Sequence, residues 1–400
     1  MGIASWTSSG AARVHEASSR IGRMARIGLL ALVAASLGAA MNGCGGRTEL
    51  DGRVGPGGGP SSGCDCDAGY GDVGLPTDAG PEDGPSCFAL PEQAVTLTSY
   101  EDVGQGTLDN IVVAPPWLYM GVTGVTPSGP PALQGFVARA PLRGGRAVSV
   151  DAQHFVGGGI ALDAARLYYT VLKTANVGDP SDRVVAQDLA SGTVQSLPAV
   201  GSVTDWATSA SWPGIFWVSD AHPAGGGTVL YQWSAASHQN VVIAEGELLY
   251  SFADEARVYW SDTSGGQTTV YSQALGGGSR KVIFRAPWSQ ARGGLLGVAR
   301  NAVVVRPDFA LGAVEVVALD GSASHSLPVA VNGASWVDQS YLYWADDGDL
   351  ALRRIPLDHG SSELVWSSGA ADVFVRSVAF DECNVYIGLT NAPGVLGRGK

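Results

Sequence analysis

The segment Val258-Tyr259-Trp260-Ser261-Asp262 decides the fold, because similar segments recur along the chain about every 45 residues. Each copy is a short apolar strand that carries one or two large side chains. The clearest other copies are Leu167-Tyr168-Tyr169-Thr170, Ile215-Phe216-Trp217-Val218 and Leu342-Tyr343-Trp344-Ala345. Self-similarity at a fixed period of this size indicates one supersecondary unit, repeated around a ring or along a stack.

The aligned position within this strand identifies seven units. A small apolar strand, such as Ile160–Leu162, precedes the aromatic strand, and a third strand, such as Gly312–Leu319, follows it. A glycine-containing hairpin, as at Asp320-Gly321, then leads into a fourth strand. Four antiparallel strands at this period are typical of a β-propeller blade. The aligned residues are Tyr119, Tyr168, Phe216, Tyr259, Val304, Tyr343 and Tyr386.

The seventh unit lacks a fourth strand of its own. Its strands fall at 377–380, 385–387 and 395–398, and an additional strand, Ala94–Thr98, precedes the first unit. If that strand forms the outer edge of the last blade, it closes the ring and removes a free sheet edge. We therefore predict an all-β protein, a seven-bladed β-propeller of four-stranded antiparallel blades over residues 87–400, closed by an N-terminal strand.

A disulfide bond follows from the same blade geometry. The turn between a blade's first two strands lies on the same face as the start of its fourth strand. Cys383 occupies that turn in the last blade, and Cys87 comes just before the closing strand. Exported proteins fold in oxidising compartments, where disulfides persist. We predict a Cys87–Cys383 bond across the closure, with two free thiols as the alternative.

Three of the aromatic strands resemble the YWTD repeats of low-density-lipoprotein-receptor propellers. They are Phe216–Asp220, Tyr259–Asp262 and Tyr343–Asp346, whereas the units at Tyr119 and Val304 lack the full motif. The repeats also resemble those of bacterial exported propeller lipoproteins of undefined activity. The resemblance covers roughly residues 90–400, and it implies aromatic packing between blades and aspartate hydrogen bonds within the structure. The residues concerned are Tyr259, Trp260, Asp262, Trp344 and Asp346.

The N-terminal segment reads as an export signal. Ile27–Ala40 is an apolar run of 14 residues that follows several arginines. It is too short for a transmembrane helix and is typical of a secretory h-region. We predict a signal peptide over residues 1–43, with Met24 as an alternative start.

The end of this signal, Met41-Asn42-Gly43-Cys44, resembles the lipobox of bacterial lipoproteins. The resemblance implies that Cys44 becomes lipidated and forms the membrane anchor. Ordinary cleavage near residues 38–40, with an unmodified Cys44, is the alternative. Gly45 follows the cysteine in place of the aspartate associated with inner-membrane retention, so the resemblance implies the outer membrane, on its periplasmic or its surface side.

Residues 44–86 are rich in glycine, proline, aspartate and serine. Such a composition cannot bury enough apolar surface to offset the entropy lost on ordering. We expect a flexible acidic tether. Cys64, Cys66, Asp67 and Asp72 leave metal binding or intermolecular thiol chemistry as the alternative for this segment.

Composition and motifs narrow the range of functions. The net charge is -13 and the chain has only three lysines, Lys173, Lys281 and Lys400, which argues against a nucleic-acid partner. The sequence contains no H-E-x-x-H pair, phosphate-binding loop or dinucleotide fingerprint, and its G-x-S-x-G pattern, Gly59–Gly63, falls in the glycine- and proline-rich segment 44–86. We therefore expect no cofactor. The residues that recur before tight turns, Asp163, Asp254, Asp338 and Asp381, are expected to cap their own backbone, with a metal as the alternative.

The six histidines, His15, His154, His222, His238, His325 and His359, show no ligand spacing and are interpreted as isolated surface residues.

Loops that open onto one face of the ring bring aromatic and acidic residues together. Aromatic rings beside carboxylates suit a sugar, a peptide or a cationic group, although space-filling between blades is the alternative for the tryptophans. This face comprises Asp205, Trp206, Asp220, His222, Trp288, Trp336, Asp346 and Asp347.

The sequence thus favours a monomeric, non-enzymatic module that binds an envelope protein or glycan and meets the membrane only through its lipid. The alternative is a calcium-dependent hydrolase or lyase with a site in the central channel. Such a site needs converging oxygen ligands on the inner strands. The candidates are Asp109, Asn110, Asp205 and Asn332. A third possibility is a purely structural role in envelope assembly.

Overall fold

The computed structural model describes residues 89–100, 103, 106–124, 134–151, 155–172, 183–197, 203–209, 212–220, 227–346, 350–390, 392 and 394–400. All described residues belong to one compact unit of the chain, Glu82–Lys400. The expected signal peptide, Cys44, the tether 44–86 and Cys87 lie outside the described residues.

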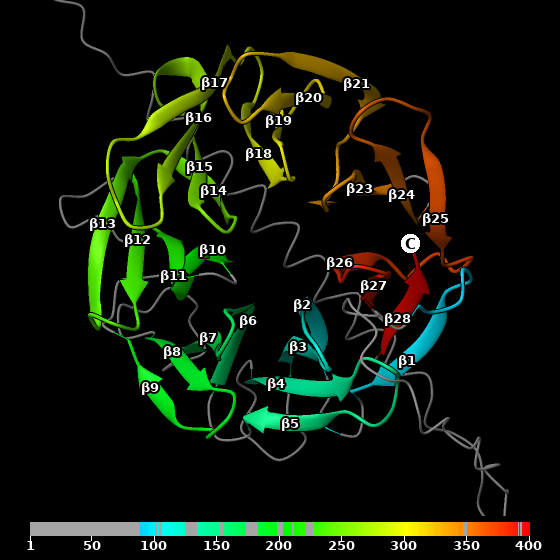
Figure 1. Cartoon of the computed structure of the whole chain (residues 1–400). Coiled ribbons are helices and arrows are strands. Elements are labelled where there is room, and N and C mark those ends of the chain that lie inside the picture. Colours follow the sequence, from blue (N-terminus) through cyan, green and yellow to red (C-terminus); the bar gives the residue numbers. More distant parts are fainter. Residues whose placement is uncertain are drawn as a thin grey trace, which may run out of the picture. The chain divides into compact units, whose positions relative to one another are not determined.

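Seven four-stranded antiparallel sheets form a ring of blades (Figure 1), as the repeats predict. The inner strands are β2 (Thr107–Ala114), β6 (Phe155–Leu162), β10 (Val203–Ser209), β14 (Leu248–Ala253), β18 (Arg292–Val298), β22 (Ser335–Val337) and β26 (Val375–Phe380). The second strands are β3 (Trp117–Gly124), β7 (Arg166–Leu172), β11 (Trp212–Ser219), β15 (Arg257–Asp262), β19 (Ala302–Asp308), β23 (Tyr341–Asp346) and β27 (Asn384–Leu389).

The third strands are β4 (Gln134–Pro141), β8 (Arg183–Asp188), β12 (Thr228–Ser234), β16 (Gln267–Ala274), β20 (Ala313–Ala318), β24 (Ala351–Pro356) and β28 (Gly394–Gly399). The outer strands are β5 (Val148–Asp151), β9 (Val194–Ser196), β13 (Gln239–Gly246), β17 (Lys281–Pro287), β21 (Ser324–Ala330), β25 (Glu363–Ser367) and β1 (Val95–Ser99). Blades are numbered below from the one that begins with β2. Within the described part of the chain the only helical turn is η1 (Ser264–Gly266).

The N-terminal strand closes the ring, which confirms the prediction. β1 pairs antiparallel with β28 and completes the seventh blade, with Val95 opposite Gly397. A side chain at Gly397 would collide with the side chains of Leu90 and Leu97, so the glycine allows the closing segment to approach. The last blade therefore joins strands from opposite ends of the propeller, and β1 covers the outer edge of β28.

The hydrophobic core lies between neighbouring blades. The second strands of all seven blades place fully buried side chains there, including the aromatic residues that define the repeat. In blades 3 and 4 a tryptophan of the second strand stacks on a tyrosine of the third. Trp217 lies 5.6 Å from Tyr231, and Trp260 lies 5.6 Å from Tyr271, both as ring-centroid distances. Such pairs add stabilisation beyond the burial of their apolar area.

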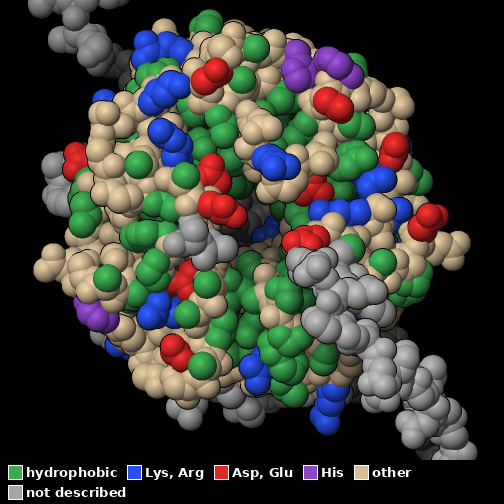
Figure 2. Space-filling model, in the orientation of Figure 1, with side chains coloured by type: hydrophobic (Ala, Val, Ile, Leu, Met, Phe, Trp, Pro, Cys, Tyr) green, Lys and Arg blue, Asp and Glu red, His purple; other side chains and the backbone are tan. Residues whose placement is uncertain are grey.

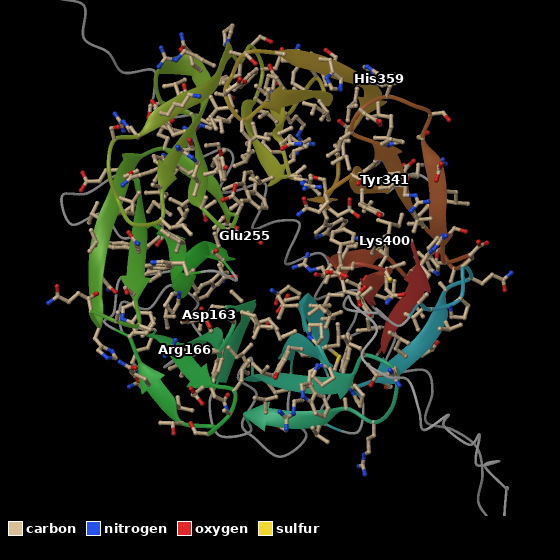
Figure 3. All side chains as sticks on the ribbon, viewed as in Figure 1. Asp163, Arg166, Glu255, Tyr341, His359 and Lys400 are labelled. Atoms are coloured by element: carbon tan, nitrogen blue, oxygen red, sulfur yellow. The ribbon has the colours of Figure 1, made fainter. Side chains whose placement is uncertain are left out.

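A recurring aspartate fixes the turn between first and second strands in four blades. In blade 4, Asp254 Oδ1 accepts hydrogen bonds from the backbone N–H groups of Ala256 and Arg257, and Oδ2 accepts one of 2.6 Å from the hydroxyl of Tyr259. The expected backbone capping is confirmed, and the tyrosine bond is an additional finding. The same arrangement joins Asp163 to Tyr168, Asp338 to Tyr343 and Asp381 to Tyr386, and Figure 3 labels Asp163 with its neighbour Arg166.

We expect Tyr259→Phe to lower the free energy of unfolding by about 1 to 1.5 kcal/mol, because Asp254 loses a charge-assisted hydrogen bond. Urea denaturation of the two proteins measures the difference. Tyr119→Phe is the matched control, since blade 1 has Ala114 at the position where those four blades have the aspartate. An equal loss in both variants would contradict this role for the aspartate.

The closure also carries a disulfide-bonded cysteine, Cys383. Its predicted partner, Cys87, lies outside the described residues, but the chain that follows it runs beside the Cys383 turn. The backbone N–H of Leu90 donates to Asn384 Oδ1 at 2.8 Å, and the N–H of Gly399 donates to the carbonyl of Pro91 at 2.8 Å. These contacts support the prediction of a Cys87–Cys383 bond.

We expect a non-reducing peptide map of the full chain to contain one Cys87–Cys383 peptide. Because this bond closes a loop of nearly the whole propeller, its reduction should lower the free energy of unfolding by about 5 kcal/mol. A Cys87→Ser variant should lose the linked peptide and most of the sensitivity to reductant. A map that links Cys383 to Cys44, Cys64 or Cys66 would overturn the pairing.

Candidate functional site

Six of the eight residues predicted for the ligand face lie among the described residues, and two of these, Asp205 and Trp206, line one cavity. Asp205 and Trp206 lie on β10, at the wall of the central channel. Trp336 packs against the hydrophobic cluster between blades 6 and 7, which agrees with the space-filling alternative. Asp220 is exposed, Asp346 pairs with Arg353 at 3.0 Å and Trp288 is half-buried, whereas His222 and Asp347 lie outside the described residues.

A cavity of about 440 Å³ opens in the channel wall where four inner strands meet. Its lining residues come from β26, β2, β6 and β10, and most of them are aliphatic, but polar atoms form more than half of the exposed surface of the cavity. Asn110, Asp205, Trp206 and Thr208 are the lining residues with polar side-chain atoms. Figure 2 shows one face of the ring, hollowed at its centre, with acidic and basic side chains around the opening. The cavity therefore offers both polar and apolar surface to a ligand.

Asp205 is the carboxylate of this cavity. Its Oδ2 accepts hydrogen bonds from the backbone N–H of Ser251, at 2.5 Å, and from the Ser251 hydroxyl, at 3.0 Å. Burial raises the pKa of Asp205 to about 7, although these hydrogen bonds favour the ionised form. The side chain thus connects the inner strands of blades 3 and 4 and changes its charge near neutral pH.

Trp206 occupies the space that a glycine leaves on β6, the inner strand of the neighbouring blade. Its indole nitrogen would lie 2.5 Å from a Cβ atom at Gly159, so only glycine leaves room for the ring. The ring packs against the cluster between blades 2 and 3 and also lines the cavity. Trp206 therefore both fills space and forms part of the cavity wall.

The other expected channel ligands connect blades. The Asn110 amide donates to the carbonyl of Ile160 at 2.7 Å and accepts from its N–H at 3.1 Å, which links blade 1 to blade 2. Asp109 accepts a hydrogen bond from the Thr123 hydroxyl and pairs with Arg376 at 3.4 Å. Asn332 is exposed in the loop after β21. Asp109, Asn110 and Asp205 therefore stabilise the ring, because inner strands of adjacent blades do not pair with each other.

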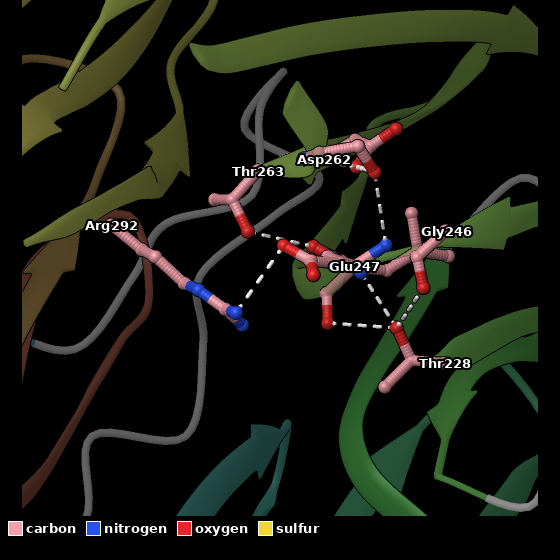
Figure 4. A network of polar contacts seen from close by, with 8 residues as sticks. Thr228, Gly246, Glu247, Asp262, Thr263 and Arg292 are labelled. Atoms are coloured by element: carbon pink, nitrogen blue, oxygen red, sulfur yellow. Dashed lines mark hydrogen bonds and ion pairs between the residues drawn. The ribbon is translucent and has the colours of Figure 1, made fainter. Parts of the chain in front are cut away.

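The connector between blades 3 and 4 shows how such contacts fix a loop (Figure 4). The Thr228 hydroxyl donates to the carbonyls of Gly246 and Leu248 at 3.1 and 3.0 Å. The carbonyl of Glu247 accepts from Thr263, and its carboxylate pairs with Arg292 of blade 5 at 3.3 Å. Both charged groups are half exposed, so we expect this ion pair to add little stability.

Arg306 is a buried cation that the sequence analysis missed. It is 3% exposed, its guanidinium lies 3.5 Å from the centre of the Phe309 ring, and it donates to the carbonyl of Val331. Its Nε has no hydrogen-bond partner, and no acidic side chain among the described residues pairs with it. Burial lowers its pKa to about 10. The one available signal was that Val303–Arg306 departs from the aromatic motif.

Within the described residues, no group of three or more His, Cys, Asp and Glu side chains is arranged to hold a metal ion. The search for membrane-spanning helices covered the same residues and found none of sufficient length and hydropathy.

The chain is similar to known proteins in its fold. No protein-family model matches it, and no curated protein sequence matches it. The β-propeller domain of the trilobed protease from Pyrococcus furiosus is similar, with a TM-score of 0.53 and 9% identity, over 73% of this chain and 95% of that one. An acylaminoacyl peptidase from Pyrococcus horikoshii has a TM-score of 0.54 and 7% identity, over 77% of this chain.

This chain spans about half of that peptidase, 52% of its length. A chain of a nidogen/laminin complex has a TM-score of 0.39 and 14% identity, over 57% of this chain and 88% of that one. At these identities the likeness concerns the propeller fold alone. Structures with this fold include peptidases, so the fold favours neither an enzyme nor a binding module.

The raised pKa of Asp205 predicts a pH dependence of stability. Between an ordinary carboxyl pKa of about 4 and the folded value of about 7, the folded protein holds a proton that the unfolded chain has released. The contribution of Asp205 is therefore fully present below pH 4 and is lost as the pH rises through 7.

Asp205→Asn should remove this dependence, because the amide stays neutral. We expect the unfolding temperature of the variant, measured against that of the wild type, to rise progressively between pH 5 and pH 8. The exposed Asp220→Asn is the control and should show no such trend. A constant difference between Asp205→Asn and wild type across this range would mean that Asp205 titrates normally.

Proposed function

We propose that this chain is a lipid-anchored β-propeller of the cell envelope that binds a protein or glycan partner without catalysis. The observation that carries the proposal is the cavity of about 440 Å³ in the channel wall, with Asp205 and Trp206 at its edge. A pocket of this size accommodates one or two side chains of a partner or a single sugar ring.

The lining suits a protein or a glycan partner. Aliphatic residues such as Val112 and Ala379 contribute apolar surface, which an apolar group of a partner can cover. Polar atoms form more than half of the exposed surface and can replace hydrogen bonds that a partner's polar groups lose to water. Asp205 can receive a positively charged group at the edge of the pocket, beside the ring of Trp206.

The polar residues of the channel do not supply the pair of carboxylates that a two-carboxylate hydrolase or lyase uses. In that chemistry both groups must be free to exchange protons with a substrate. Both side-chain atoms of Asn110 are engaged by the backbone of Ile160, and Asp109 is held by Thr123 and Arg376. Asp205 is therefore the one cavity carboxylate that could act on a ligand, and a single carboxylate suits charge recognition.

The proposed lipid anchor and the proposed location at the outer membrane are argued from features of the sequence. The apolar run before Cys44 and the lipobox-like end of that run support lipidation of this cysteine. A tether over 44–86 would let the propeller reach partners at some distance from the membrane. Outer-membrane attachment and a monomeric state belong to the same proposal.

The test uses the full-length exported protein with a photo-reactive phenylalanine analogue at Thr208, a cavity residue. We expect a discrete protein adduct after irradiation of cells, and loss of that adduct when Ala379→Phe fills the cavity. The analogue at Val241, an exposed position on outer strand β13, is the matched control and should not give this adduct. Circular dichroism checks that Ala379→Phe stays folded.

Three outcomes would count against the proposal. Identical adducts from both positions, or an adduct that survives Ala379→Phe, would remove the cavity from the binding surface. An adduct displaced by purified envelope polysaccharide would show a glycan ligand in place of a protein. Turnover of a substrate by the wild type that depends on added calcium, and that is lost in Asp205→Asn, would favour the hydrolase or lyase.

A further inference from the structure

Two histidines that are far apart in the sequence meet on the surface. His325 belongs to β21, the outer strand of blade 5, and His359 lies in the hairpin between β24 and β25 of blade 6. Their ring centroids are 5.0 Å apart, with an angle of 57° between the ring planes. The expectation of isolated histidines is therefore wrong for this pair. Figure 2 shows histidine side chains gathered near the rim, where Figure 3 labels His359.

The separation of the rings matches that of two imidazoles on one metal ion. A zinc ion binds a histidine nitrogen at about 2.0 to 2.1 Å, which places each ring centroid about 3.2 Å from the metal. At a tetrahedral angle, two such rings have centroids about 5 Å apart. The observed separation of 5.0 Å is therefore that of two rings bound to one ion.

A hydrogen bond already sets the tautomer of one ring. His325 Nε2 lies 2.8 Å from the carbonyl oxygen of Leu357, which can only accept, so Nε2 carries the hydrogen. In the neutral ring Nδ1 then keeps its lone pair free for a ligand. Metal-bound histidines commonly donate their second N–H to a backbone carbonyl in this way, which orients the ring and raises its basicity.

The two rings differ in exposure, and one of them faces solvent, from which ions can enter. His325 is half-buried and fixed by Leu357, whereas His359 is exposed in its hairpin. Asp358, next to His359, is also exposed and places a carboxylate in the same hairpin. Water would fill the remaining coordination positions, so the site remains open to solvent.

We propose that His325 and His359 form a binding site for a first-row transition-metal ion, such as Zn²⁺, that joins blades 5 and 6. Imidazole nitrogen suits this class of ion, whereas Ca²⁺ and Mg²⁺ require oxygen ligands. The proposal is independent of the central cavity. The histidines are 34 positions apart and belong to different blades, which explains why no motif marks them.

The test is calorimetric titration of the untagged full chain with ZnCl₂ at pH 7.5. We expect the wild type to bind one equivalent of Zn²⁺. We expect His359→Gln to bind Zn²⁺ at least tenfold more weakly, because one of two protein ligands is lost. His359→Gln is the decisive variant, since it leaves the bond between His325 and Leu357 in place. His325→Gln should act similarly. His238→Gln, at the other described surface histidine, is the matched control and should bind as the wild type does.

A second readout separates this site from thiol binding near the N-terminus. Zn²⁺ should raise the unfolding temperature of the wild type and of a Cys64→Ser/Cys66→Ser variant equally, and should have no such effect on His359→Gln. Absence of Zn²⁺ binding in the wild type would overturn the proposal. So would binding that persists unchanged in both histidine variants, or binding that is lost with Cys64 and Cys66.

Discussion

The pairing of β1 with β28 is the constraint on which the rest of the ring depends. Neighbouring blades share no backbone ladder, so each is held to the next mainly by contacts of side chains. Closure by a strand from the other end of the propeller converts this row of blades into a ring in which every blade has two neighbours. The disulfide-bonded Cys383 and the bond from Leu90 to Asn384 lie at this same junction.

Once the ring is closed, two kinds of contact hold adjacent blades together. Large apolar side chains of the second strands fill the space between sheets, and polar side chains of the inner strands bridge the channel wall. The second kind explains why carboxylates and amides near the channel resemble a ligand set in the sequence. Asn110 and Asp205 satisfy backbone groups of the next blade, and an unpaired buried N–H would cost free energy comparable to a lost hydrogen bond.

The channel wall is therefore polar both in its connections and over much of the surface that its cavity exposes. The cavity lies against four consecutive inner strands, and Asp205 contributes its carboxylate. Burial raises the pKa of Asp205, and the hydrogen bonds from Ser251 oppose part of that rise because they stabilise the ionised carboxylate. A ligand that offers a positive charge would take over part of that role.

The sequence by itself determined the number of blades, the strand order within each and the closing strand, because a period of this size and the position of Tyr259 and its counterparts follow from the local β-pattern. It also marked the turn aspartates, such as Asp254, since their hydrogen bonds are local. Only the tertiary structure decided which residues of different blades meet. Asp205 reaches Ser251 and His325 lies beside His359, because the packing of one blade on the next, and not the repeat within a blade, sets these distances. The tertiary structure also decided that Arg306 is buried with no acidic partner among the described residues.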